Sequence, residues 1–390
     1  MQPNMNRNNS TTDSEESIQK NLLCFSHLRW DFVFQRPQHL LTRFSHDVNV
    51  FFLEEPFLDA PEAAFLEFDQ KSDTLTVMRP HLRSGLSAEE INKALVALLN
   101  NFLKQEDLQD WMFWYYTPMA LSFSAHLKPA TIIFDCMDEL SAFDFAPKEL
   151  VDLEVKLLQI ADVVFTGGRS LYEAKKHQHG NIYSFPSSID KKHFALSRSI
   201  KQEPQDQALI VGEKLGFFGV IDERFDLELI DYLAEQKPNW QIILIGPVVK
   251  IDPATLPRRS NIHYLGQKSY QQLPGYLSGW DLALIPFKLN ESTRFISPTK
   301  TPEYLAAGVP VVSTPIRDVV NPYGIQELVE IAESQEEFLL AAETALREKQ
   351  SAAWLAKVDL FLADKSWDHT YVQMKQKISL LQTQDKLLAS

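Results

Sequence analysis

Lys300 and Glu303 stand in the segment of the chain whose residue types are best suited to holding a phosphorylated ligand. Near the start of this segment a capping residue precedes a proline at two places, and a glycine and a valine-rich run follow. This pattern predicts a short helix, beginning at 297 or at 301, that leads into a buried strand. The residues concerned are Ser297, Pro298, Thr299, Lys300, Glu303, Tyr304 and Gly308.

Two interpretations of this segment stand side by side. Either start of the helix leaves free backbone N–H groups and the positive end of the helix dipole next to Lys300, which together attract a phosphate. Glu303 lies within the first turn or two, where its carboxylate can accept hydrogen bonds from sugar hydroxyls. The same residues also fit an ordinary capped helix with a surface lysine and a glutamate that complements the dipole.

A second group of polar and aromatic residues follows the first predicted strand, residues 22–26. A loop right after that strand faces the crevice of an α/β sheet and suits recognition of an acceptor or a diphosphate. We expect Arg36 to supply the charge and Trp30 to stack on a sugar face. A structural loop held by aromatic packing is the alternative. The loop contains His27, Arg29, Trp30, Asp31, Phe32, Phe34, Arg36 and His39.

The elements that must position these residues alternate between short apolar strands and helical patterns, which indicates parallel sheets built by right-handed crossovers. Ser87 opens one helix, to 102, with Glu90 at the capping-box position. Periodicity is lost over 191–207, between two such series. We therefore predict a disordered tail (1–20), a first Rossmann-like domain (21–200), a second (208–365) and a C-terminal helix (366–390).

Composition excludes several classes of protein. The chain has 390 residues, 13 glycines and a net charge of −14, which argues against a collagen-like chain and a non-specific nucleic-acid binder. Most glycines lie in the second half, several just after an apolar strand, so the second domain is the better candidate for phosphate binding. No run is long and apolar enough to span a membrane, and the polar start is no secretory signal. We expect a cytoplasmic protein, with Cys24 and Cys136 as buried free thiols.

Other chemistries find little support. His177 and His179 lack a matching carboxylate or cysteine, so we expect no metal site. There is no Asp-x-Asp triplet, no P-loop, no Gly-x-Gly-x-x-Gly fingerprint and no Gly-x-Ser-x-Gly elbow. We expect no cofactor.

Several segments also carry a family resemblance. Residues 297–312 resemble the donor-site motif of GT-B glycosyltransferases, in particular the large retaining family four (group 1). The endings Phe218-Gly219 and Ile245-Gly246-Pro247 look like the first two strand ends of the donor domain. Residues 26–40, 134–141 and 185–190 are similar to a bacterial subgroup linked to cell-wall and exopolysaccharide synthesis. The resemblance covers most of the chain.

The resemblance implies a GT-B fold: two Rossmann-like domains whose parallel sheets face a central cleft, with the C-terminal helix crossing back to the first. It implies that Glu303 binds the ribose of a nucleotide sugar and that Lys300 and Arg224 neutralise the departing diphosphate. For Arg224 the alternative is a surface arginine paired with its acidic neighbours. The implied donor contacts are Gly219, Gly246, Pro247, Ser297, Pro298, Thr299, Lys300, Glu303 and Tyr304.

The sequence departs from the family pattern at two places. Family four usually has a second glutamate eight positions before Glu303, where this chain has Phe295. Many members also carry a histidine after a buried strand of the first domain, where this chain has Met137. Asp138 and Glu139 follow at that strand end. There they can contact sugar hydroxyls or assist the acceptor, or they can simply cap the next segment.

The resemblance implies a metal-independent, retaining transfer of sugar to a saccharide or polyprenyl-linked acceptor in surface polysaccharide synthesis. A polyprenyl-linked acceptor would bring the protein to the inner face of the cytoplasmic membrane. Arg224, Lys300 and Asp138 are the catalytic candidates, and His27, Trp30, Arg36 and Glu139 are the cleft or acceptor candidates. The alternatives are a GT-B-fold epimerase of nucleotide sugars and a non-catalytic nucleotide-sugar or glycan-binding protein.

Overall fold

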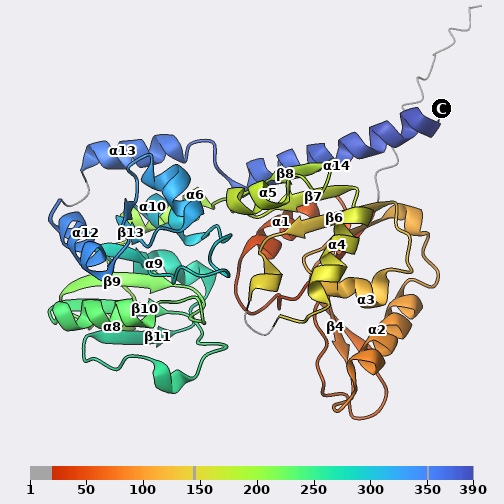
Figure 1. Cartoon of the computed structure of the whole chain (residues 1–390), viewed down its shortest axis with the longest axis horizontal. Helices are drawn as coiled ribbons and strands as arrows, with labels where there is room; N and C mark the ends of the chain where they lie inside the picture. The colour runs from red at the N-terminus through yellow and green to blue at the C-terminus, as the bar shows by residue number, and fades with distance from the viewer. Residues whose placement is uncertain (1–19, 144–145, 349–350, 390) are drawn as a thin grey trace, which may run out of the picture.

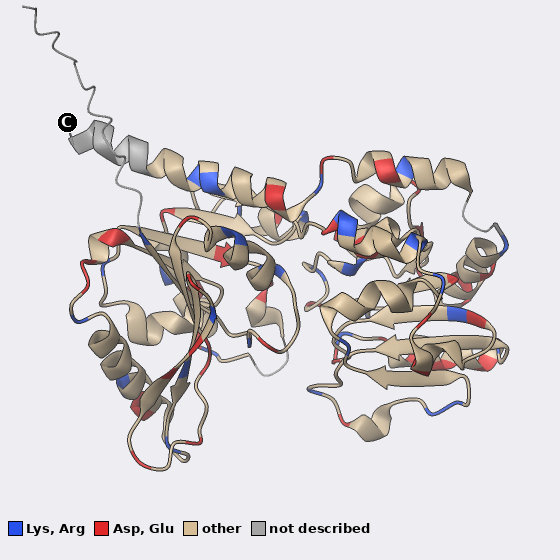
Figure 2. Cartoon of the chain, turned by 180° about the vertical axis from the view of Figure 1, so that it is seen from behind, with Lys and Arg blue, Asp and Glu red and all other residues tan. Residues whose placement is uncertain are grey.

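The computed structural model describes residues 20–143, 146–348 and 351–389, which form two α/β units side by side (Figure 1). The predicted disordered tail lies outside the described residues, apart from Lys20. Acidic and basic residues are interspersed along the ribbon of both units (Figure 2).

The first unit is built on an eight-stranded sheet, counted over the described residues, in the order β3-β4-β2-β1-β5-β6-β7-β8. Its pairs are parallel except β3 with β4, which form the hairpin at one edge. The strands are β1 (Asn21–Phe25), β2 (Asn49–Leu53), β3 (Phe65–Ser72), β4 (Leu75–His81), β5 (Trp111–Tyr115), β6 (Thr131–Cys136), β7 (Val163–Thr166) and β8 (Ile182–Ser184). The helices are α1 (Arg36–Phe44), α2 (Ala88–Phe102), α3 (Leu121–Ser124), α4 (Leu150–Ile160) and α5 (Arg169–Lys175).

Alternate residues of the strands bury opposite faces of this sheet. Leu22 and Cys24 of β1 join one apolar cluster, which includes residues of α1 and of the C-terminal helix. Leu23 and Phe25 join the other, which includes residues of α2, α3 and α4. Because successive side chains of a strand point to opposite faces, β1 anchors both layers and holds the loop that follows it at the cleft.

The second unit has a parallel sheet, six-stranded in the described part of the chain, in the order β11-β10-β9-β12-β13-β14. Its strands are β9 (Glu213–Phe218), β10 (Trp240–Ile245), β11 (Ile262–Gly266), β12 (Leu282–Ile285), β13 (Val311–Ser313) and β14 (Glu330–Ile331). Its helices are α7 (Gln205–Ala208), α8 (Leu227–Gln236), α9 (Leu273–Leu277), α10 (Lys300–Ala307), α11 (Arg317–Val319), α12 (Gln335–Glu348) and α13 (Ala352–Phe361).

Local sequence explains several boundaries. The predicted capping box at the start of α2 is present: the Ser87 side chain accepts a hydrogen bond from the Glu90 N–H, and Glu90 reaches back to the Ser87 N–H. Helix α10 begins at Lys300, between the two predicted starts, with Thr299 as its N-cap residue. It ends at Gly308, whose φ of 80° is a left-handed cap.

The segment predicted as an irregular boundary differs from the structure. Part of residues 191–207 forms α6 (Lys191–Ala195), because Asp190 caps that helix through the His193 N–H. Phe194, predicted in the first domain, is fully buried in the apolar core of the second unit. Ser197 and Arg198 donate to the carbonyl groups at the end of α10. The packing therefore places residues 191–200 on the second unit.

The last helix, α14 (Trp367–Ala389), runs along the first unit beside α1, as predicted (Figure 1). Arg43 on α1 pairs with Asp368 at 2.7 Å, and Asp47 accepts hydrogen bonds from Tyr371 and Lys375. After the second unit, the chain thus returns to pack on the first unit through α14, which links the two units.

A carboxylate of the second unit also caps a helix of the first. Asp318 accepts hydrogen bonds from the backbone N–H groups of Arg169 and Ser170, at 2.8 and 2.9 Å, at the start of α5. Gly168 makes this approach possible, because a Cβ there would overlap the Asp318 carboxylate and lie 2.9 Å from the Ser297 Cβ. We call this contact the interdomain clasp.

Candidate active site

A cavity of about 640 Å³ lies between the two units, where the carboxyl ends of their parallel strands face each other. Loops that follow β1, β6, β9, β10 and β11 contribute to its wall, and so does the start of α10. The predicted site residues that line it are Trp30, Asp138, Gly219, Arg224, Gly246, Pro247, Ser297, Pro298, Thr299, Lys300 and Glu303.

Lys300 is held among apolar and cationic groups in the cavity. Its ammonium lies 5.4 Å from the ring centre of Phe217 and 5.6 Å from that of Phe287. It makes no hydrogen bond within the described residues, so its N–H donors remain available to a ligand. Burial, with Arg224 nearby, lowers the pKa of Lys300. An anion bound here would therefore be stabilised, because it would pair with a half-buried ammonium whose N–H donors are free.

Two strand ends next to Lys300 require glycine. Gly219 and Gly246 both have a φ of 143°, and each stands where its strand meets the cavity. The Lys300 side chain passes so close to Gly219 that a Cβ there would overlap it. A Cβ at Gly246 would in turn overlap the Gly219 carbonyl. The predicted donor-site glycines therefore let the backbone and the lysine pack at close range.

Arg224 both pairs with an acidic neighbour and lines the cavity. Its guanidinium pairs with the buried Asp222, with the shortest contact at 2.6 Å, and lies over the Phe143 ring at 5.0 Å. It also lines the cavity and is close enough to Lys300 to affect its pKa. Asp222 thus holds a second cation at the same end of the cavity as Lys300.

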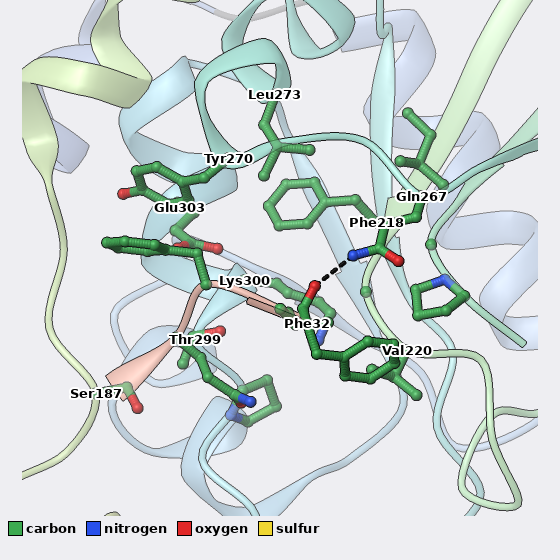
Figure 3. A pocket seen from close by; sticks show the side chains of 18 of the residues that line it. Phe32, Ser187, Phe218, Val220, Gln267, Tyr270, Leu273, Thr299, Lys300 and Glu303 are labelled. Atoms are coloured by element: carbon green, nitrogen blue, oxygen red, sulfur yellow. Dashed lines mark hydrogen bonds between the residues drawn. The ribbon is translucent and has the colours of Figure 1, made fainter. Parts of the chain in front are cut away.

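Glu303 and Tyr304 are neighbours in sequence with different surroundings. Glu303 is 7% exposed and lines the cavity, and burial raises the pKa of its carboxyl group. Figure 3 shows Glu303 next to Tyr270 and above Lys300. Tyr304, predicted as a donor contact, is fully buried and its hydroxyl accepts a hydrogen bond from the Phe218 N–H. Tyr304 fastens α10 to β9 and does not line the cavity.

Asp138 and Glu139 are also neighbours in sequence, and only one of them lines the cavity. Asp138 lines the cavity, and burial raises its pKa while Arg224 acts in the opposite direction. Glu139 instead pairs with Lys175 at 2.8 Å, beside Glu154, and is not among the residues that line the cavity. The prediction that Glu139 faces the acceptor is wrong, because Lys175 holds its carboxylate behind the strand end.

The loop after β1 also corrects two predictions. Arg36 is 1% exposed; its guanidinium binds the Asp135 carboxylate, at 2.8 to 3.1 Å, and the Phe185 carbonyl. It is a structural ion pair rather than a charge in the cleft. His27 does not line the cavity, and burial lowers its pKa to about 4. Trp30 does line it, although its ring packs edge-on against Phe52.

Four aromatic residues also line the cavity: Phe34 and His39, which belong to the predicted recognition loop, and Tyr270 and Trp367, which sequence reasoning did not assign to a site. We call them the aromatic end. Phe34 lies 4.6 Å from Tyr270, and His39 stacks on Trp367 at 4.6 Å. Phe34 and His39 belong to the loop and helix after β1, and the aromatic richness of that loop was the available signal. Tyr270 and Trp367 carried no local signal because only the folded chain brings them there.

The position that departs from the family pattern, Phe295, has a packing role. Its ring packs against the core of the first unit rather than into the cavity.

The Gln267 side chain donates a hydrogen bond across the cleft to the Phe32 carbonyl, a contact that Figure 3 shows as a dashed line. Together with the interdomain clasp, these contacts hold the two units around the cavity. The described residues contain no group of three His, Cys, Asp or Glu side chains placed to hold a metal ion.

Comparison with known proteins agrees with this geometry. Residues 213–361 match the family model described as "Glycosyl transferases group 1". The fold is shared with a solved E. coli structure described as "Trehalose-6-phosphate from E. coli bound with UDP-2-fluoro glucose", with a TM-score of 0.69, 13% identity and coverage of 93% of this chain and 99% of the other. Sucrose-phosphate synthase from Thermosynechococcus elongatus gives a TM-score of 0.69 at 14% identity, covering 95% and 100%.

The two facing sheets and the matched domain define the class: a glycosyltransferase with the GT-B fold, as predicted. Among curated proteins, the chain is similar to TuaH of Bacillus subtilis (strain 168), named for a glycosyltransferase role in teichuronic acid biosynthesis. The two are 26% identical over 294 residues, which cover 70% of this chain and 68% of TuaH.

Proposed function

We propose that this protein transfers a sugar from a nucleotide-sugar donor to a saccharide or lipid-linked acceptor during synthesis of a bacterial surface polysaccharide. The likeness to TuaH supports the pathway class, and the UDP-2-fluoro glucose in the E. coli structure supports the donor class. The observation that carries the proposal is the free ammonium of Lys300 beside Arg224 at the start of α10.

The proposed transfer uses this arrangement at the leaving group. As the bond between the sugar and the diphosphate breaks, negative charge grows on the phosphate, and Lys300, Arg224 and the N–H groups at the start of α10 stabilise it. Glu303 binds the ribose hydroxyls. We propose that the chemistry is metal-independent and retaining, as in family four, with the leaving phosphate assisting removal of the acceptor proton.

Asp138 stands on the first-unit side of the same cavity. Burial raises the pKa of its carboxyl group, and the carboxylate faces the space in which an acceptor hydroxyl would lie. We propose that it positions that hydroxyl, together with Trp30, which also lines the cavity.

No helix in the described residues is long and apolar enough to cross a membrane. For a polyprenyl-linked acceptor, we propose a local contact of the protein with the inner face of the cytoplasmic membrane.

The test is transfer of labelled sugar from a panel of nucleotide sugars to polyprenyl-phosphate and saccharide acceptors. Lys300→Ala should lower kcat by at least about 100-fold, the scale of losing one group that stabilises transition-state charge. Glu303→Gln should raise the donor KM. Arg259→Ala is the control, because Arg259 pairs with Asp231 and does not line the cavity. Full activity of both site variants would refute the proposed donor site.

Two alternatives give different products. An epimerase would convert the donor without any acceptor, and a binding protein would bind the donor with no turnover. Product analysis with and without acceptor therefore separates all three functions.

A further inference from the structure

The loop between β1 and α1, residues 26–35, forms part of the cavity wall and has little regular structure of its own. Trp30 and Asp31 at its centre both line the cavity. Residues 26–35 contain neither helix nor strand, and the Phe32 N–H reaches the Arg29 carbonyl within the loop only at 3.3 Å. Side chains from outside the loop must therefore supply partners for its backbone and fix its conformation.

Two buried side chains hold the backbone of Trp30 from opposite ends of the residue. The Trp30 N–H donates to the Glu54 carboxylate at 2.8 Å, and the Trp30 carbonyl accepts a hydrogen bond from the Gln38 amide at 2.7 Å. Glu54 directly follows β2 and is 4% exposed, and Gln38 lies on α1 and is 1% exposed. We call Glu54 and Gln38 the Trp30 clamp. Because both side chains are shielded from water, both hydrogen bonds are stronger than they would be at the surface.

The carboxylate of the clamp is itself held by two arginines. Arg29 donates to Glu54 at 3.2 Å, and the Arg79 guanidinium lies 3.5 Å from the same carboxylate oxygen. Arg79 belongs to β4 and also pairs with Asp31 at 2.7 Å. Trp30 and Asp31 are thus tied, through Glu54 and Arg79, to the hairpin at the edge of the first sheet.

Gln38 extends the same restraint along the loop. Its amide also donates to the Val33 carbonyl at 3.1 Å, and its oxygen accepts a hydrogen bond from the Gln35 N–H at 3.0 Å. Val33 and Gln35 line the cavity, whereas neither Glu54 nor Gln38 is among its lining residues. Any effect of the clamp on a bound substrate must therefore pass through the loop.

Resting on the proposed function, we propose that Glu54 and Gln38 are positioning residues for the acceptor: by holding the Trp30 backbone, they place its indole ring where it contacts the acceptor sugar. A ring on a fixed backbone loses less conformational freedom on binding than a ring on a free loop. The clamp therefore sets the affinity for the acceptor. The affinity for the donor is independent of it, because Lys300, Arg224 and Glu303 belong to the second unit.

Steady-state kinetics of the full chain tests this proposal, with the acceptor that the wild type uses best among polyprenyl phosphates and saccharides. Glu54→Leu removes the acceptor of the Trp30 N–H, and Gln38→Met removes the donor to the Trp30 carbonyl. Each should raise the acceptor KM about 5- to 10-fold, the scale of one lost hydrogen bond, and leave the donor KM unchanged. Glu54→Gln keeps a side-chain oxygen at the same distance and should recover most of the acceptor affinity.

Fluorine NMR of the protein labelled with fluorotryptophan reports on Trp30 without any substrate. The Trp30 resonance is identified by its loss in Trp30→Phe. Glu54→Leu should shift or broaden this resonance, and Glu54→Gln should restore it. An unchanged Trp30 resonance in Glu54→Leu would overturn the proposal, because the carboxylate would then not position the ring.

Gln207→Leu is the matched control. Gln207 is fully buried and accepts a hydrogen bond from the Trp280 indole N–H at 2.9 Å, and neither residue lines the cavity. This variant should lower the free energy of unfolding and move the Trp280 resonance, while the acceptor KM and the Trp30 resonance stay as in the wild type. An equal rise of the acceptor KM in Gln207→Leu would overturn the proposal, because general destabilisation would then explain it.

The two measurements separate this proposal from the proposed function. If the wild type transfers sugar and both Glu54→Leu and Gln38→Met keep its acceptor KM, the proposed function stands and the positioning role is refuted. If the wild type transfers no sugar from any donor, the proposed function fails and the acceptor role of the clamp fails with it. The fluorine spectrum then still decides whether the clamp holds Trp30.

Discussion

The Lys300 side chain passes through the space that a Cβ atom would fill at Gly219, with its ammonium nitrogen 2.7 Å from that position. The absence of a side chain at Gly219, the residue that follows β9, therefore decides where the ammonium group of Lys300 lies in the cavity. The atoms that would be displaced belong to the flexible end of the lysine, so a larger residue moves the charge before it disturbs the fold.

Gly219→Ala should therefore weaken binding of a nucleoside diphosphate at least about 10-fold, through displacement of Lys300 and strain at a φ of 143°. Calorimetry measures the affinity. Gly266→Ala is the matched control, because Gly266 also has a positive φ, of 70°, but has no atom within 4 Å of its Cβ position. Equal losses in the two variants would show that backbone strain alone is responsible.

The affinity for a nucleoside diphosphate should fall as the pH rises above neutral. Burial lowers the pKa of Lys300, so the free site loses this positive charge at a lower pH than an ordinary lysine would. Lys300→Arg keeps its charge across the range, since guanidinium has a pKa above about 12. Its affinity should therefore fall less steeply between about pH 7 and 9.5, where the buried Glu303 carboxyl, whose pKa is raised to about 8, still titrates. Parallel profiles for the two proteins would contradict the role of Lys300.

Acid should destabilise the fold through buried neutral histidines. Burial lowers the pKa of His39 to about 3, whereas an unfolded histidine binds its proton below about pH 6.5. The unfolded state therefore binds more protons between these values, and stability decreases as the pH falls through them. His39 contributes at most about 1.4 kcal/mol per pH unit.

Urea unfolding between about pH 7 and 4.5 measures this slope. His39→Phe keeps an aromatic ring and should make the dependence on pH shallower. The exposed His369, replaced by Gln, is the control and should leave it unchanged. If the free energy of unfolding depends on pH with the same slope in His39→Phe and in the wild type, His39 is not a source of the loss of stability in acid.

The interdomain clasp should hold the cleft closed. Asp318→Ala removes a helix cap worth about 1–2 kcal/mol and with it a link between the units. We expect a larger radius of gyration in small-angle scattering and weaker nucleotide binding. Asp226→Ala removes a cap within the second unit, on the Leu229 N–H, and should leave the radius unchanged. Unchanged scattering in Asp318→Ala would mean that other contacts suffice for closure.

Arg36 should matter to stability rather than to substrate recognition. Arg36→Met leaves the Asp135 carboxylate buried without its partner, which should cost about 3–5 kcal/mol in the free energy of unfolding. Arg259→Met, which breaks a partly exposed pair with Asp231, should cost less than about 1 kcal/mol. Denaturant unfolding compares the two. A small effect of Arg36→Met combined with a raised acceptor KM would restore the original prediction for Arg36.

Prediction from the sequence succeeded where the signal was local. The alternation of strands and helices, the capping box of α2 and the Gly308 cap each depend on residues a few positions apart. The position of Lys300 at the start of a helix was accessible for the same reason. Phe194 shows the limit, because nothing near it in sequence indicates that its ring enters the core of the second unit.

The sequence by itself determined the parallel α/β architecture and the helix start that presents Lys300 and Glu303, because periodicity and caps act over short separations. Only the tertiary structure decided which side chains reach the cavity. Arg36 and Asp138 both follow strands of the first unit, yet a carboxylate 99 residues away buries the arginine while Asp138 faces the cleft. Trp367 reaches it only because α14 returns to the first unit. Such choices depend on contacts between distant segments, and residue type and spacing do not specify these contacts.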